Sequence, residues 1–266
     1  MAAPNQITAA QLSRLVGTPD APMLVDVRLD ADFALNPALI PASFRHPHSD
    51  LAALVTRLAE AKSVIICQRG RKLSEGVAAL LRSHGLASEV LEGGADAWAA
   101  LALPMVPVAA IPATNTWVTR QRPKVDRIAC PWLIRRFVDP TARFLFVAPS
   151  EVQSVADRFD ATPFDIDGVA WSHDGPDCTF DTMVRRFGLS APAMDRLATV
   201  VRAADTDRHD LAPQAAGLLA LSVGLSRMFR DDLQQLEAGM TLYDALYRWA
   251  RDGFDEGHDW PAGRAQ

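Results

Sequence analysis

The sequence predicts an α/β N-terminal domain, with a parallel sheet and flanking helices, followed by a mostly α (α+β) C-terminal domain. Short apolar runs alternate with helical patterns over the first hundred residues, which favours a parallel sheet. A stretch of small residues and prolines then has the composition of a linker. Beyond Phe180 the pattern is almost entirely helical.

These composition changes divide the chain into two domains. We place a first domain at 1–108, a linker at 109–116, a second domain at 117–253 and a tail at 254–266. A total of 266 residues fits two domains of ordinary size.

The first domain begins with a helix, because Thr8 and Gln11 have the spacing of a capping box and Gly17 suits the helix end. The third helix is expected to begin at Ser74, with Ser74 as its N-cap. Apolar runs predict strands at 23–27, 64–66 and 89–91, and helical spacing predicts further helices at 51–58 and 94–101.

The second domain has a helical pattern first and two short strands after it. The expected elements are a helix at 127–138, a strand at 144–147, a helix at 150–160 and a strand at 163–166. Further helices are expected from Asp181, Ala191, Pro213 and Thr241.

Charge and cysteine content restrict the class of protein. A net charge of −5 lacks the basic footprint of a duplex nucleic-acid binder, so we expect no nucleic-acid partner. Three widely spaced cysteines do not make a disulfide framework, which fits a reducing cytosol. Residues 215–225 are the most apolar window, but they are half as long as a membrane span and predict a core helix. We therefore expect a cytoplasmic protein without a membrane partner.

Cys67 is the candidate nucleophile, because it directly follows a short β-branched strand and precedes a helix. A turn at this junction points backbone N–H groups inward and forms a cradle for an anion. The cradle residues are Gln68, Arg69, Gly70, Arg71 and Lys72. Their three cations, with the helix dipole, are expected to lower the pKa of the thiol. The alternative interpretation is a buried structural cysteine.

A cysteine phosphatase needs an arginine six residues after its nucleophile to hold phosphate through two hydrogen bonds. Leu73 stands at that position. The sequence therefore disfavours phosphatase chemistry.

Four segments in order resemble the rhodanese family over about one hundred residues. They are LVDVR at 24–28, IPAS at 40–43, the Cys67 loop and LEGGADAW at 91–98. The resemblance implies a parallel-sheet domain that needs no cofactor, in which Cys67 accepts and passes on sulfane sulfur and residues 68–72 cradle it. Asp26 and Arg28 match a strand-end pair with a structural role, and Ala42 replaces a usual glycine.

Segments at 122–137, 163–166, 172–181 and 204–207 resemble the C-terminal domain of the chromate-resistance protein ChrB family. The resemblance covers essentially the whole second half. It implies a link to bacterial chromate resistance, sometimes within regulatory proteins.

Two further sites are candidates in this second half. His173, Cys178, Asp205 and Asp207 carry donors that suit a transition metal, although their spacing matches no closed zinc pattern. The alternative is a hydrogen-bonded loop histidine with buried cysteines. Arg127, Arg135 and Arg136 are candidates for an oxyanion-binding helix face, because arginine grips oxyanions through several donors. The alternative is a helix face of salt bridges.

The function predicted from these features is a rhodanese-type sulfurtransferase or persulfide carrier involved in bacterial chromate resistance. Its partners would be a thiosulfate-like sulfur donor, a thiol acceptor and chromate. The alternative is a non-catalytic regulatory protein that senses redox state, an oxyanion or a metal.

Overall fold

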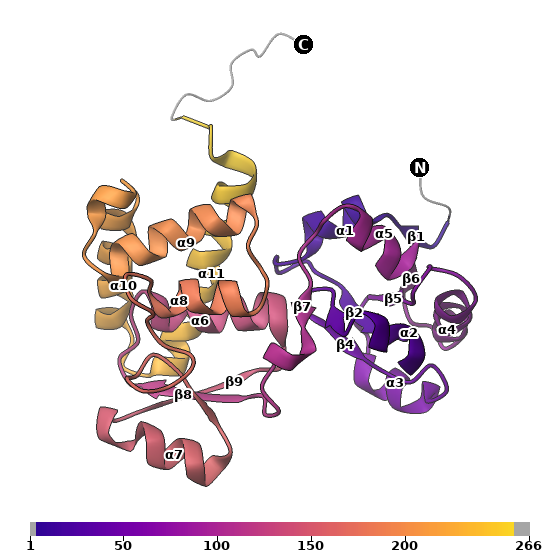
Figure 1. Cartoon of the computed structure of the whole chain (residues 1–266), viewed down its shortest axis with the longest axis horizontal. Coiled ribbons are helices and arrows are strands. Elements are labelled where there is room, and N and C mark those ends of the chain that lie inside the picture. Colours follow the sequence, from indigo (N-terminus) through magenta and orange to yellow (C-terminus); the bar gives the residue numbers. More distant parts are fainter. Residues whose placement is uncertain (1–3, 258–266) are drawn as a thin grey trace.

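The computed structural model describes residues 4–257. Strands and helices of the first hundred residues form one lobe, and a mainly helical second lobe follows (Figure 1). The predicted tail at 254–266 falls largely outside the described residues.

The first lobe is built on a five-stranded parallel sheet with strand order β1-β6-β5-β2-β4. Its strands are β1 (Gln6–Ile7), β2 (Met23–Asp26), β4 (Ser43–Arg45), β5 (Ser63–Ile66) and β6 (Ser88–Leu91). The helices that accompany it are α1 (Ala9–Leu15), α2 (Asp30–Leu35), α3 (Leu51–Leu58), α4 (Lys72–Ser83) and α5 (Gly94–Ala100). This confirms the predicted α/β class.

Helices cover both faces of this sheet, and because alternate residues of a strand point to opposite faces, neighbouring residues contact different helices. In β5, Val64 and Ile66 pack in the same apolar cluster as α1 and α5, whereas Ile65 packs with α3 and α4. The capping box at the start of α1 is present: Thr8 Oγ1 accepts from the Gln11 N–H at 3.1 Å, and Gln11 Oε1 accepts from the Thr8 N–H at 3.0 Å.

The segment that leads into the predicted linker is tied to the first lobe. The short strand β7 (Val106–Pro107) pairs antiparallel with β3 (Ala38–Leu39), and a 3₁₀ turn at Val108–Ala110 follows.

The second lobe combines a three-stranded parallel sheet, of order β10-β8-β9, with a group of helices. Its strands are β8 (Thr116–Arg120), β9 (Arg143–Val147) and β10 (Thr162–Pro163). Its α-helices are α6 (Asp126–Leu133), α7 (Val152–Phe159), α8 (Thr179–Arg186), α9 (Pro192–Asp205), α10 (Ala215–Met228) and α11 (Asp232–Arg248). The predicted helix at 127–138 is thus α6 continued by a π-helical turn at Ile134–Val138.

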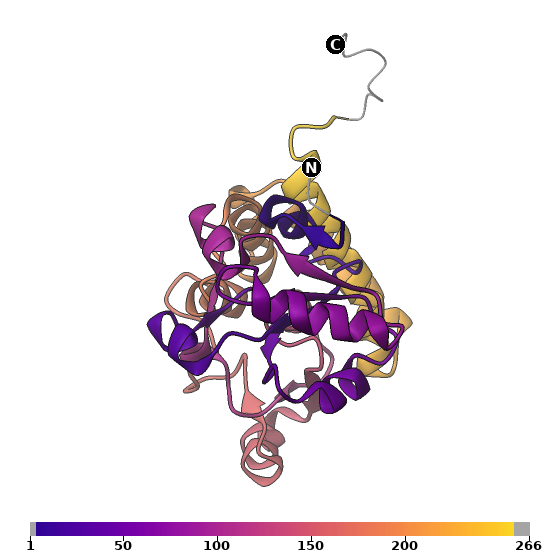
Figure 2. The same ribbon diagram turned by 90° about the vertical axis from the view of Figure 1, so that its right-hand side faces the viewer.

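One apolar cluster runs from the α1/α5 side of the first sheet into the second lobe. In Figure 2 the first lobe lies in front of the second lobe. At this junction the Ala42 N–H donates to the Phe137 carbonyl at 2.7 Å, and Arg251 donates to the Arg14 carbonyl at 2.9 Å. Gly17 lies directly against the Phe137 ring.

Helix α10 differs from the expected core helix. Its buried side chains include the polar Ser222 and Ser226, whereas Leu221 and Met228 are 55% and 74% exposed. Ser222 Oγ accepts from the Val125 N–H at 2.8 Å, so α10 is held partly by hydrogen bonds at its inner face. Residues 4–257 contain no helix with the length and hydropathy needed to cross a bilayer.

Candidate functional site

The Cys67 loop connects the carboxyl end of β5 to the amino end of α4. Strand β5 lies in the middle of the sheet, between β6 and β2, and its four residues are all buried. Helix α4 begins at Lys72, so residues 67–71 form the turn. Helix amino ends favour negative charge, since their first N–H groups have no partner within the helix.

The amino end of α5 holds the loop in place. The Ala95 N–H donates to the Cys67 carbonyl and the Asp96 N–H donates to the Gln68 carbonyl, both at 3.0 Å. Gly70 and Gly94 have φ angles of 62° and 63° and lie so close that a Cβ on Gly94 would be 2.5 Å from the Gly70 nitrogen. Gly94, in the segment at 91–98, therefore serves close packing against the loop.

The Cys67 thiol is 5% exposed and lies beside hydrogen-bond donors. Its Sγ is 3.1 Å from Ser74 Oγ and 3.4 Å from the Arg71 nitrogen, whose N–H points at the sulfur. Burial raises the pKa of the thiol, but the Ser74 hydroxyl and the backbone N–H groups of Ser74, Arg71 and Arg69 together lower it below its ordinary value. The loop thus favours a thiolate.

Ser74 was expected to be the N-cap of α4, and this prediction was wrong. The helix begins two residues earlier, with Arg71 at the N-cap position. Ser74 instead lies in the first turn, fully buried, with its hydroxyl 3.0 Å from the Arg71 carbonyl. Its contact with the thiol was missed. Its position seven residues after Cys67, in the first turn of the helix that follows the loop, is the signal that could have indicated this contact.

The expected effect of the three loop cations also needs correction. In the described part of the chain, the side chains of Arg69, Arg71 and Lys72 are not among the main causes that lower the thiol pKa. Arg69 is 78% exposed in its side chain and approaches Asp96 at 3.8 Å. The three cations do line a pocket of about 440 Å³ together with Cys67, Gln68, Leu73 and Asp32.

Asp26 and Arg28 form a buried ion pair at the end of β2. Arg28 Nε donates to Asp26 Oδ2 at 2.8 Å, and Arg28 also donates to the Ala38 carbonyl. The pair ties the strand end to β3.

The three arginines of the predicted oxyanion-binding face are all ion-paired. Arg127 lies in α6, and Arg135 and Arg136 lie in the π-helical turn that follows it. Arg136 makes two 2.8 Å hydrogen bonds to Asp244, and Arg135 donates to Glu237 at 2.6 Å. Arg127 contacts a different carboxylate, that of Asp165, at 3.2 Å. Each arginine has its own carboxylate partner, so their charges are already compensated, as in the alternative interpretation of a salt-bridged helix face.

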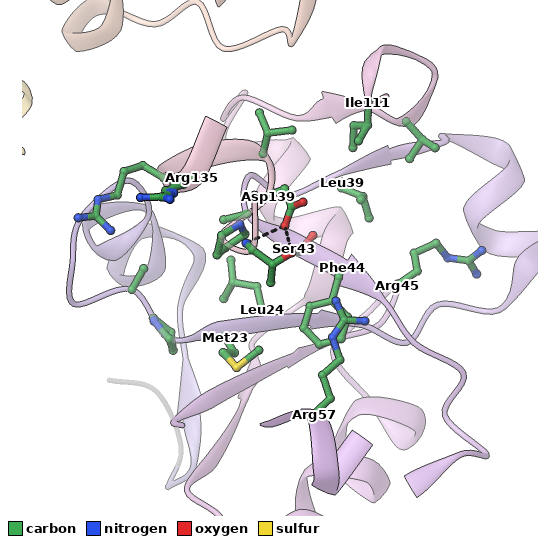
Figure 3. A pocket seen from close by; sticks show the side chains of 18 of the residues that line it. Met23, Leu24, Leu39, Ser43, Phe44, Arg45, Arg57, Ile111, Arg135 and Asp139 are labelled. Carbon is green, nitrogen blue, oxygen red and sulfur yellow. Dashed lines mark hydrogen bonds between the residues drawn. The ribbon is translucent and has the colours of Figure 1, made fainter. Parts of the chain in front are cut away.

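Arg135 and Arg136 also line a pocket of about 610 Å³ between the two lobes. Figure 3 shows Phe44, Leu24 and Met23 on the first-lobe side of this pocket, with Arg57 over the Phe44 ring at 3.5 Å. Its lining is mostly apolar and does not include Cys67.

A second cluster of chemically active side chains lies in the second lobe. His173 Nε2 is 3.6 Å from Asp126 Oδ2, 3.5 Å from Asp165 Oδ1 and 3.3 Å from Asp205 Oδ2. Asp126 begins α6, Asp205 ends α9, and Asp165 follows β10. Asp126 and Asp165 are buried, at 2% and 3% exposure, whereas the His173 side chain is 42% exposed.

Burial and neighbouring charges shift the pKa values of Asp126, Asp165 and His173 in this cluster. Burial, followed by the neighbouring Asp165 charge, raises the pKa of Asp126 to about 7. The carboxylates of Asp126, Asp165 and Asp205, which face its imidazole, raise the pKa of His173 to about 12. For Asp165 burial is outweighed by hydrogen bonds from His173 and Arg120, which hold its pKa below the ordinary value.

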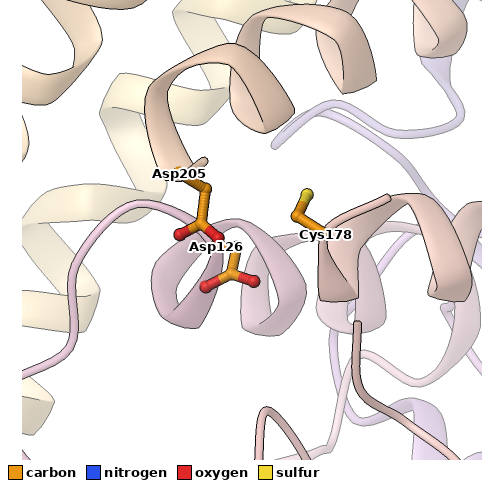
Figure 4. A group of neighbouring side chains, drawn as sticks. All are labelled: Asp126, Cys178 and Asp205. Carbon is orange, nitrogen blue, oxygen red and sulfur yellow. The ribbon is translucent and has the colours of Figure 1, made fainter. Parts of the chain in front are cut away.

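The structure brings together three of the four predicted metal ligands. Cys178 adjoins Asp126 and Asp205, with donor atoms within 4.8 Å of one another (Figure 4). Its thiol is fully buried and donates to Asp181 at 3.2 Å, and burial raises its pKa well above the ordinary value. Asp207 does not join them: its side chain is 95% exposed and its nearest ionic partner is His209 at 3.8 Å.

Asp126 and Asp165 were missed as members of the cluster. The signal for Asp126 was an acidic residue opening a helix whose other residues are largely apolar, and for Asp165 an acidic residue directly after a strand.

Comparison with known proteins identifies both halves. The model of the rhodanese-like domain matches residues 8–101, and that of the ChrB C-terminal domain matches residues 117–250. The fold and the matches define a class, a rhodanese-like domain followed by a ChrB-type domain. Because the second match makes up half of the chain, the protein belongs to the family of the ChrB C-terminal domain.

Protein ChrB of Cupriavidus metallidurans is 38% identical over 133 residues, which are 49% of this chain and 39% of that protein. The matched part is therefore well under half of that relative.

Solved structures with partial similarity include a rhodanese-related protein from Thermoplasma volcanium, 27% identical, covering 38% of this chain and 97% of that chain with a TM-score of 0.34. A rhodanese-like domain protein from Staphylococcus aureus is 25% identical, covering 35% and 90% of the two chains with a TM-score of 0.32.

Proposed function

We propose that this protein carries sulfur on Cys67 and serves bacterial chromate resistance. The observation that carries the proposal is the position of the Cys67 sulfur, 3.4 Å from the Arg71 nitrogen and 3.1 Å from the Ser74 oxygen, beside a pocket at a helix amino end. Donors in this arrangement stabilise a thiolate before the reaction and a persulfide anion after it.

The reaction follows from the thiolate. The Cys67 sulfur attacks the outer sulfur of a thiosulfate-like donor, the sulfur–sulfur bond of the donor breaks, and sulfite leaves with the electron pair. The resulting Cys67 persulfide is then attacked at its outer sulfur by an acceptor thiolate. This step transfers the sulfur to the acceptor and restores the Cys67 thiolate.

The cations of the loop have a separate role in this proposal. The side chains of Arg71 and Lys72 line the pocket but are not among the main causes that lower the thiol pKa, so in this proposal they act on the charge of the incoming donor. Lys72→Ala should raise KM for thiosulfate and leave the pH midpoint of thiol alkylation unchanged. A shifted midpoint would assign Lys72 to thiol activation instead.

The direct test is transfer of sulfur from thiosulfate to cyanide by the full chain. Wild type should form thiocyanate and Cys67→Ser should not, whereas Cys130→Ala removes a buried thiol outside the loop and should retain the rate. Negligible and equal rates for wild type and Cys67→Ser would refute sulfur transfer from this donor.

The role in chromate resistance is supported by membership of the ChrB C-terminal domain family and by the 38% identical relative named Protein ChrB. Because that relative is matched over 39% of its length, its whole activity is not transferred to this chain. Deletion of the gene should lower chromate tolerance, and restored tolerance should need Cys67. Unchanged tolerance on deletion would contradict this role.

A regulatory or metal-sensing protein is the second candidate, and the His173–carboxylate cluster is the observation that favours it. Complementation of the gene deletion with variants distinguishes sensing from sulfur transfer. If His173→Ala abolishes chromate tolerance while Cys67→Ser restores it fully, sensing is favoured over sulfur transfer.

A further inference from the structure

Three carboxylates converge on a single nitrogen in the second lobe. His173 Nε2 lies 3.3–3.6 Å from one oxygen each of Asp126, Asp165 and Asp205. Asp126, Asp165 and His173 offer donor atoms that all lie within 4.8 Å of one another. The residues come from four places in the sequence, so the fold, and not a local motif, creates this arrangement.

The distances from His173 Nε2 to the three carboxylate oxygens fit ligands around a shared metal ion better than they fit hydrogen bonds. A protonated imidazole has one Nε2–H, which can donate well to only one oxygen at a time. The three distances exceed the usual hydrogen-bond length of about 2.9 Å. An ion held tetrahedrally at about 2.0–2.2 Å separates its ligands by about 3.3–3.6 Å. The imidazole–carboxylate distances match that separation.

Neighbouring groups hold the carboxylates of Asp126 and Asp165 in place. Asp165 Oδ2 accepts from Arg120 at 2.7 Å and lies 3.2 Å from Arg127, which leaves Oδ1 facing His173. Thr179 donates its hydroxyl to Asp165 Oδ1 at 3.0 Å and its N–H to Asp126 Oδ2 at 3.3 Å. Partners of this kind orient ligand carboxylates around a metal.

We propose that Asp126, Asp165 and His173 bind one divalent transition-metal ion, with Asp205 as the fourth donor. Imidazole with carboxylates suits Zn²⁺ and its neighbours better than Ca²⁺ or Mg²⁺, which prefer oxygen ligands alone. The ion reaches the site from the side of His173, the most exposed of the four side chains. This inference is independent of sulfur transfer at Cys67.

Cys178 is a neighbour of the site and not a ligand in this proposal. Its buried thiol is directed to Asp181, to which it donates at 3.2 Å, and it lies outside the group of donor atoms that His173 forms with Asp126 and Asp165. Whether Cys178 is instead a metal ligand is directly testable. Co²⁺ bound by nitrogen and oxygen alone gives weak visible bands, but a thiolate ligand adds an intense near-ultraviolet charge-transfer band.

The experiment uses the full chain purified without chelator, with elemental analysis first and Zn²⁺ titration by calorimetry after chelator treatment. Wild type should hold about one ion per chain, and His173→Ala should lose it. The matched pair is Asp205→Asn and Asp207→Asn, because Asp207 lies two residues further on with a 95% exposed side chain. Asp205→Asn should weaken Zn²⁺ binding about tenfold or more, and Asp207→Asn should not.

Two results would overturn the proposal. One is wild-type protein that holds no ion and binds no Zn²⁺ in the titration, since a protonated His173 then neutralises the carboxylates alone. The other is a thiolate charge-transfer band in the wild-type Co²⁺ spectrum, which would replace the proposed donor set. The Co²⁺ spectrum needs no variant, so it decides the donor set even if His173→Ala fails to fold.

Discussion

Gly17→Ala should destabilise the protein through the junction of the two lobes. Gly17 has a φ of +80°, and a Cβ there would lie 2.1 Å from Phe137 Cζ. The Phe137 ring is confined, because it packs edge-on against Trp132 at 5.6 Å and Tyr247 at 5.4 Å between ring centroids. A non-glycine residue in left-handed conformation costs about 1–2 kcal/mol. Overpacking a confined ring adds about 1–3 kcal/mol.

Gly85→Ala is the matched control, because Gly85 has a φ of +82° but no atom within 4 Å of its Cβ position. It should cost only the conformational term of about 1–2 kcal/mol. Thermal unfolding followed by calorimetry compares the two variants, and for a chain of this size each kcal/mol lowers Tm by about 2–4 °C. Equal destabilisation by the two variants would refute the packing of Gly17 against Phe137.

Three further outcomes are expected. The rate of Cys67 alkylation by iodoacetamide should rise with pH, and its midpoint should lie below that of free cysteine because the pKa of the thiol is lowered. Ser74→Ala should move this midpoint upward. An unmoved midpoint would contradict the role of the Ser74 hydroxyl. Gly94→Ala should abolish sulfur transfer, because its Cβ would lie 2.2 Å from the Cys67 carbonyl, whereas Gly76→Ala, with open space around it, should keep the thiocyanate rate. Ala42→Gly should raise the free energy of unfolding in urea by up to about 1 kcal/mol, because Ala42 has a φ of 63°; a loss of stability would argue against strain there.

The α/β class of the first domain could be predicted because its signals are local. A β-branched strand that leads into Cys67, a capping box at Thr8 and a glycine pair before Trp98 each occupy a few consecutive residues. The thiol environment was less predictable. The cations near Cys67 are visible in the sequence, but whether their side chains point at the sulfur depends on the fold.

In the second domain, the arrangement of the site residues was even less predictable from local sequence. Asp126 and Asp165 are 39 positions apart, and no local pattern indicates that a helix start and a strand end meet at His173. Asp205 and Asp207 look equivalent in sequence, but α9 ends at Asp205 and Asp207 has a φ of 56° with its side chain in solvent. A difference of two residues at a helix end decided which carboxylate faces the cluster.

The central claim is that Cys67 carries sulfur, and mass spectrometry of the protein isolated from cells tests it most directly. The Cys67 peptide should be heavier than its unmodified form by one sulfur atom, and treatment with a reducing thiol should remove that mass. A Cys67 peptide that stays unmodified, both from cells and after incubation with thiosulfate, would contradict the account.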